Sequence, residues 1–102
     1  MNIPDIIGFV ATATIDELGR MLIPIQARIL IGCTPADKLE AIPDELDGTL
    51  LLYRDNGGNL EMDDFGRVVL EEDLRSLLGW AIGQQIEFQK CNERNCLVLM
   101  KA

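Results

Sequence analysis

The chain has 102 residues, of which 48% are hydrophobic and 25% are charged. This length and composition favour one compact domain over a disordered segment. The formal net charge of −8 opposes indiscriminate binding to nucleic acid or anionic lipid, because both are negatively charged. The apolar run at residues 6–15 is too short to span a bilayer, and no basic segment precedes it as in a secretory signal. We therefore expect a cytoplasmic protein without membrane contacts.

The first half of the chain predicts two strands, a short helix and two more strands. Asp16 and Gly19 are typical of a tight turn after the first strand. Pro24 suits the first helical position, and Gly32 suits the left-handed position beyond the end of the helix. A polar loop is expected at 43–48, before the last strand of this half. The predicted strands cover residues 9–15, 21–23, 38–42 and 49–54.

The second half repeats this pattern when the sequence is shifted by 47 positions. Gly, Arg and Leu positions with demanding geometry coincide, and no gap is needed over most of the two copies. The aligned pairs include Gly19-Arg20 with Gly66-Arg67, Arg28 with Arg75, and Gly32 with Gly79. The predicted elements of this half are strands at 60–62, 68–70, 85–89 and 96–100 and a helix at 71–78.

We assign the first repeat to residues 8–54, the linker to 55–59 and the second repeat to 60–101, within one domain covering 1–102. Five linker residues reach at most about 17 Å, so the two repeats must lie side by side. Each repeat alone is too small to bury a good core and would leave open sheet edges. A mainly β fold with two short helices is therefore expected, in which two ββαββ repeats interleave their hairpins into one barrel.

The run Asp16-Glu17-Leu18-Gly19-Arg20, followed by Ile23-Pro24 and Arg28, resembles the signature of the AbrB (SpoVT-AbrB) family. That signature is valine-Asp-Glu-Leu-Gly-Arg, an apolar pair, Ile-Pro and an Arg-bearing helix that ends in Leu-Gly. The similarity covers residues 15–32 and extends to residue 54. A weaker copy runs from residue 63 to 79, with Glu71 where the signature has proline. Two tandem copies in one chain are similar to the MraZ-like relatives of this family, although here both copies keep the Gly-Arg turn.

The resemblance implies a swapped-hairpin (double-split) β-barrel and a small prokaryotic transcriptional regulator that binds duplex DNA through arginines on one face. We expect the chain to act as a pseudo-dimer or, as a homo-oligomer, in the form of a dimer of pseudo-dimers. Arginine contacts phosphate and pairs bidentately with guanine. The predicted DNA-binding residues form two pairs around a pseudo-twofold axis and are Arg20, Arg28, Arg67 and Arg75.

A structural role competes with DNA binding at each of these arginines. Arg20 and Arg67 each follow an acidic turn and are equally well explained by a salt bridge that shapes the loop. Arg28 and Arg75 lie on predicted helices, where an arginine is commonly part of a solvated face.

Several features favour an alternative, a protein–protein interaction or oligomerisation module that kept the barrel and lost DNA binding. The segment before the first turn is Ala-Thr-Ala-Thr at 11–14, where the family is basic, and the second helix opens with three acidic residues at 71–73. Ile29 and Ile31 are candidates for exposed apolar residues on the first helix. Trp80 suits an interface anchor, or a plug at one end of the barrel, which we favour.

No enzymatic activity is expected, so no catalytic residue is assigned. The chain contains no histidine, Ser76 is its only serine, and no phosphate-binding glycine-rich loop is present. The three cysteines lack a CxxC pair and predict reduced thiols rather than a zinc site. We accordingly expect neither a cofactor nor a bound metal.

Overall fold

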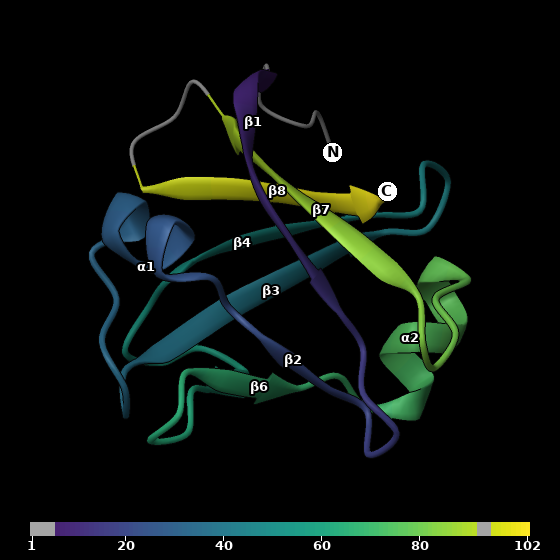
Figure 1. Ribbon diagram of the computed structural model, residues 1–102, viewed down its shortest axis with the longest axis horizontal. Coiled ribbons are helices and arrows are strands. Elements are labelled where there is room, and N and C mark those ends of the chain that lie inside the picture. Colours follow the sequence, from purple (N-terminus) through teal and green to yellow (C-terminus); the bar gives the residue numbers. More distant parts are fainter. Residues whose placement is uncertain (1–5, 92–94) are drawn as a thin grey trace.

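Both halves of the chain fold in the same order in the computed structural model (Figure 1), which describes residues 6–91 and 95–102. The first half contains β1 (Ile6–Thr14), β2 (Arg20–Leu22), α1 (Ile25–Ile31), β3 (Lys38–Asp44) and β4 (Thr49–Arg54). The second half contains β5 (Leu60–Glu61), β6 (Arg67–Val69), α2 (Glu72–Leu78), β7 (Gln85–Cys91) and β8 (Cys96–Lys101). The predicted mainly β fold with two short helices is confirmed.

Strands of the two halves are exchanged within one antiparallel sheet. Its order is β1-β7-β8-β4-β3-β5, so the first strand of each half pairs with the third strand of the other half. β4 and β8 pair at the centre. Neither half therefore completes its own strand pairing, and both halves contribute strands to one sheet.

A second sheet is a two-stranded ribbon made by β2 and β6, one strand from each half. Figure 1 shows this ribbon below the larger sheet, with α1 and α2 on opposite sides of the molecule. Among the described residues the hydrogen-bonded ladder does not close on itself, since β1 and β5 are its edges. The edge at β5 is short, because β5 pairs with β3 only at Lys38 and Leu39. The closed barrel therefore stays a prediction.

Both helices end as the sequence predicts, at a glycine in the left-handed conformation. Gly32 has φ of 65°, and its N–H donates to the carbonyl oxygens of Arg28 and Ile29. Gly79 caps α2 in the same way, with φ of 70°. The start of α1 differs from the prediction: Pro24, with ψ of 148°, is the N-cap residue, and the helix begins at Ile25.

The third strand is longer than predicted and includes part of the expected loop at 43–48. β3 continues through Pro43, which pairs with Leu50, to Asp44. Proline is tolerated there because only β4 borders this end of β3, so no second strand needs its missing N–H. The Asp44 Oδ1 atom then accepts the backbone N–H groups of Leu46 (3.1 Å) and Asp47 (3.3 Å) and starts the turn.

The core lies between the larger sheet and the ribbon, and both halves contribute to it. Trp80 is 3% exposed and its Nε1–H donates to the Gly48 carbonyl oxygen at 3.2 Å, which joins the end of α2 to the β3–β4 turn. Ile31 is buried, contrary to our expectation of an exposed residue, because it shares the inward face of α1 with Ala27. Ile29, the other candidate on α1, is exposed.

The linker between the halves is hydrogen-bonded to β3 rather than loosely attached. The Asn59 side chain accepts the Ala41 N–H (2.9 Å) and donates to the Ala41 carbonyl oxygen (3.2 Å). The Asp55 N–H donates to the Lys38 carbonyl oxygen at 3.0 Å. Asn59 thus makes both bonds that a neighbouring strand residue would make at this position.

Candidate nucleic-acid interface

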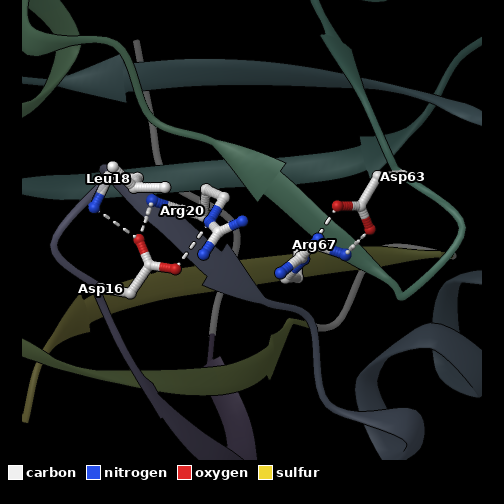
Figure 2. Close-up of polar contacts among 5 residues, drawn as sticks. All are labelled: Asp16, Leu18, Arg20, Asp63 and Arg67. Carbon is white, nitrogen blue, oxygen red and sulfur yellow. Dashed lines mark hydrogen bonds and ion pairs between the residues drawn. The ribbon is translucent and has the colours of Figure 1, made fainter.

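A tight turn leads into each strand of the ribbon, and an aspartate holds it in place. In the first turn the Asp16 Oδ1 atom accepts the backbone N–H groups of Leu18 (2.9 Å) and Arg20 (2.8 Å), as Figure 2 shows. Gly19 has φ of 78°, a conformation that favours glycine. These contacts explain why an Asp and a Gly three residues apart encode the turn.

The second turn repeats this geometry. The Asp63 Oδ1 atom accepts the backbone N–H groups of Phe65 and Arg67, each at 2.9 Å. Gly66 has φ of 83°. The local structure around both ribbon arginines is therefore the same, as the internal repeat predicts.

Arg20 and Arg67 form the salt bridges that the sequence offered as the alternative to DNA binding. Arg20 Nε lies 2.7 Å from Asp16 Oδ2, and Arg67 Nε lies 2.8 Å from Asp63 Oδ2 (Figure 2). Both side chains remain about one-third exposed, at 32% and 30%. Each guanidinium is therefore oriented by its turn, and part of its charge is balanced there.

The carboxylates of these turns are stabilised in their charged form. The backbone N–H of Arg20 is the main cause that lowers the pKa of Asp16, and the Arg20 side chain lowers it further. The pKa of Asp63 is lowered in the same way by the backbone N–H and side chain of Arg67. Asp16 and Asp63 consequently stay ionised at neutral pH, so their ion pairs with Arg20 and Arg67 persist.

The helix arginines lie against the turn of the opposite half. The Arg28 Nε–H donates to the Ile23 carbonyl oxygen (2.9 Å), and its guanidinium packs so closely on Gly66 that an added Cβ would lie 2.8 Å from Cζ. We call Arg28, Arg67 and the Phe65–Gly66 turn segment the Arg28–Arg67 cluster. Arg28 forms no ion pair with any described residue, so its charge is not balanced by a carboxylate contact.

The equivalent arrangement in the other half involves Arg75. Its Nε–H donates to the Leu70 carbonyl oxygen (2.9 Å), and a Cβ added to Gly19 would lie 3.6 Å from the guanidinium. We call Arg75, Arg20 and the Leu18–Gly19 turn segment the Arg75–Arg20 cluster. The four predicted residues are thus brought together as two clusters, each with one arginine from either half.

All four guanidiniums share one feature, an Nε–H used for an internal hydrogen bond. No hydrogen bond between described residues uses their terminal nitrogens. An arginine held in this way loses less conformational entropy on binding, and its terminal nitrogens match the oxygens of a phosphate. The arrangement is suited to recognition of an anion.

The outer face of the ribbon carries apolar residues beside Arg20 and Arg67. These apolar residues were not among the sites expected from the sequence. Met21 and Val68 point into the core, so their neighbours in each strand point outward. Leu22 is 47% and Val69 46% exposed. The sequence could have shown the outward position of Leu22 and Val69, because side chains alternate between the two faces along each short strand.

The turn tips add two more exposed apolar side chains, Leu18 and Phe65. They are equivalent in the repeat, but only Phe65 is aromatic. The guanidinium of Arg67 lies over its ring, 4.9 Å from the centroid. A stacked aromatic and guanidinium present both a π-face and hydrogen-bond donors at the surface.

Two further findings concern other kinds of site. Within residues 6–91 and 95–102, no group of His, Cys, Asp and Glu side chains is arranged to hold a metal ion. In the same part of the chain, no helix is long and apolar enough to cross a membrane.

The chain was also compared with known proteins. No family model, curated protein or solved structure matches it.

Proposed function

We propose that this chain is a transcriptional regulator of the AbrB type that acts in the cytoplasm and binds duplex DNA through Arg20, Arg28, Arg67 and Arg75. The observation that supports this most strongly is the shared internal hydrogen bond at Nε of all four guanidiniums. It orients two clusters of donors around one exposed ribbon, in an arrangement repeated by both halves. Contacts of this kind position a protein on the phosphate backbone and read guanine in the major groove.

The proposal includes the swapped-hairpin (double-split) barrel as the scaffold. Pairing of β1 with β7 and of β5 with β3 supports it, because each half donates its first strand to the other. Because β2 and β6 run antiparallel, with Arg20 opposite Val69 and Leu22 opposite Arg67, the two turns lie at opposite ends of the ribbon.

The net charge of −8 limits the size of the contact. Nucleic-acid affinity depends on neutralised phosphates, and each one contributes about −0.9 to the slope of log affinity against log salt. Four arginines therefore suit a short, salt-sensitive footprint rather than a long non-specific one.

The test is selection from a random duplex library at low salt, followed by binding measurements on the enriched sequence. Replacing all four arginines with alanine is expected to weaken binding by about 100-fold or more, since several phosphate or base contacts are lost. A matched control removes four cations outside the clusters, Lys38, Arg54, Lys90 and Lys101, and keeps the overall charge equal to that of the test variant. A comparable loss in this control, or the absence of any enriched sequence, contradicts the proposal.

A second candidate is an interaction or oligomerisation module of the same fold. The specific observation that favours it is the group of exposed apolar residues on the ribbon and its turns: Leu18, Leu22, Phe65 and Val69. Such a patch marks protein contacts more often than phosphate contacts. Sedimentation over a range of concentrations tests it, with Leu18→Ser/Phe65→Ser as the disrupting variant. Self-association that this variant abolishes, in a chain that selects no DNA, would favour the module.

A further inference from the structure

The two arginine clusters are alike in geometry but differ in the charge around them. Each has two arginines and a turn with two carboxylates, at positions 16 and 17 or 63 and 64. The helix that carries Arg28 has no acidic residue in its first turn, whereas the helix that carries Arg75 has Glu72 and Asp73 there. Glu71 stands before them as the N-cap residue, where the first half has Pro24. The helix of the Arg75–Arg20 cluster therefore begins with three carboxylates that the helix of the other cluster lacks.

These carboxylates lie within electrostatic reach of Arg75. Glu72 is three positions before Arg75, and residues so spaced are neighbours on a helix surface. All three acidic side chains are exposed, and none forms an ion pair with Arg75. Neighbours at this spacing have Cβ atoms about 5–6 Å apart, less than the Debye length of about 8 Å at physiological salt, so solvent ions only partly screen the effect of Glu72 on a phosphate held by Arg75.

A groove on one side of α2 is also acidic. A hollow of about 470 Å³ is lined by Glu45, Asp73, Ser76 and Leu77. It contributes a further carboxylate on the α2 side, from the β3–β4 turn. On the α1 side the residues equivalent to Glu72 and Ser76 are Ile25 and Ile29, which are exposed and uncharged.

The Arg28–Arg67 cluster also has a group that its counterpart lacks. Phe65 is 72% exposed and stacks with Arg67. Leu18 occupies the equivalent turn position near Arg20. An exposed aromatic ring beside two oriented guanidiniums adds apolar contact with a sugar, or with the methyl group of thymine, to the phosphate contacts.

We infer that the Arg28–Arg67 cluster makes the dominant DNA contact, so that the chain reads one asymmetric half-site rather than a palindrome of two equal half-sites. The inference rests on the proposed function. The pseudo-twofold symmetry of the fold is thus not matched by symmetry of the electrostatic field. The carboxylates at 71–73 repel the phosphates that Arg75 would otherwise hold, and the second cluster contributes little.

The experiment compares Arg28→Ala with Arg75→Ala in the full chain, on the duplex enriched from a random library. The two residues occupy equivalent positions and make equivalent internal hydrogen bonds, so their effects on folding are matched. Arg28→Ala is expected to weaken binding by about tenfold or more and to reduce the salt slope by about one. Arg75→Ala is expected to change affinity by less than about threefold and to leave the slope unchanged.

A second variant is designed to restore DNA contact by the Arg75–Arg20 cluster. Glu72→Gln/Asp73→Asn is expected to tighten binding by about three- to tenfold, because two repulsive charges are removed. In that background Arg75→Ala should cost as much as Arg28→Ala. The matched control Glu40→Gln/Glu87→Gln removes the same charge from the face of the larger sheet that points away from the core. It is expected to change affinity by less than about twofold, since Glu40 and Glu87 alternate with the core-facing residues of β3 and β7 and lie on neither the ribbon nor α2.

The outcomes separate this inference from the proposed function. Equal losses for Arg28→Ala and Arg75→Ala, with a palindromic enriched site, overturn the inference and leave DNA binding in place. Failure to retain any duplex overturns both. Circular dichroism of each variant establishes that it is folded before the affinities are compared.

Discussion

Met21 and Val68 stand opposite each other in the β2–β6 ribbon, and they are 47 positions apart, the shift at which the two halves of the sequence align. Each residue therefore pairs with its own counterpart, so a pseudo-twofold axis passes through this pair. Leu51 and Val98 have the same relationship at the centre of the larger sheet. The axis joins the two sheets and places the two arginine clusters on opposite sides of the ribbon.

Separating the two halves tests whether each half folds only in the presence of the other. Peptides covering residues 1–56 and 57–102 are each expected to lack a cooperative unfolding transition, because β1 and β5 would lose their partner strands. An equimolar mixture should recover β structure in circular dichroism. Stable β structure in either peptide alone would show that a half can pair with its own copy instead.

Gly66→Ala is expected to lower the free energy of unfolding by about 1–2 kcal/mol, because a non-glycine residue is strained in the left-handed conformation. It should also displace the Arg28 guanidinium, since the new Cβ would lie 2.8 Å from Cζ. Urea denaturation measures the first effect and DNA affinity the second.

Two other glycines provide the comparison for Gly66→Ala. Gly19→Ala carries a similar backbone cost, and its Cβ would lie 3.2 Å from the Leu70 carbonyl oxygen but 3.6 Å from the Arg75 guanidinium, so it should not displace Arg75. Gly8→Ala meets no atom within 4 Å and is expected to be neutral. A destabilisation by Gly8→Ala as large as that by Gly66→Ala would argue against the left-handed strain.

Stability is expected to fall in acid because of the two turns. The pKa values of Asp16 and Asp63 are lowered in the folded chain, chiefly by the backbone N–H groups of Arg20 and Arg67. A lowered folded-state pKa gives stability that is present above the unfolded pKa of about 4 and is lost as pH falls through the folded value. Thermal unfolding between pH 7 and pH 2 measures this loss.

The double variant Asp16→Asn/Asp63→Asn tests whether these two groups cause the loss of stability at low pH, the acid limb of the stability profile. Asparagine keeps an oxygen that accepts the turn N–H groups but has no charge to titrate. The variant is expected to be less stable at neutral pH and to show a flatter acid limb. An acid limb of unchanged steepness would assign the pH dependence to other carboxylates, such as Asp37, whose pKa is lowered by the backbone N–H of Thr34.

Trp80→Phe is expected to cost about 1–3 kcal/mol of unfolding free energy. The change removes the 3.2 Å hydrogen bond from Nε1–H to the Gly48 carbonyl oxygen and leaves space at a site that is 3% exposed. Urea denaturation followed by circular dichroism measures the loss. Tyr53→Phe, at a half-buried position of β4, is the control and should change the free energy by less than about 0.5 kcal/mol. Equal costs would mean that the Trp80 contact does not stabilise the fold.

Much of the candidate site could be predicted from the sequence, because its turns are local structures. Asp16 bonds the N–H groups of residues two and four positions later, and Gly32 ends its helix through a backbone angle that only glycine adopts easily. Such features depend on a few neighbouring residues. For the same reason both salt bridges of the ribbon, each four residues apart, were among the expected alternatives.

Other features came from contacts between distant parts of the chain. Nothing local to Arg28 indicates that its guanidinium lies on Gly66, since the two are brought together by packing of the opposite halves. The inward position of Ile31 and the exposure of Leu22 likewise depend on which face meets the core. The order of the strands is also non-local, and β5 borders β3 through two residue pairs only. Residues 15–32 therefore encode their own turn and helix end, whereas tertiary packing determines which turn each arginine meets and which charges surround it.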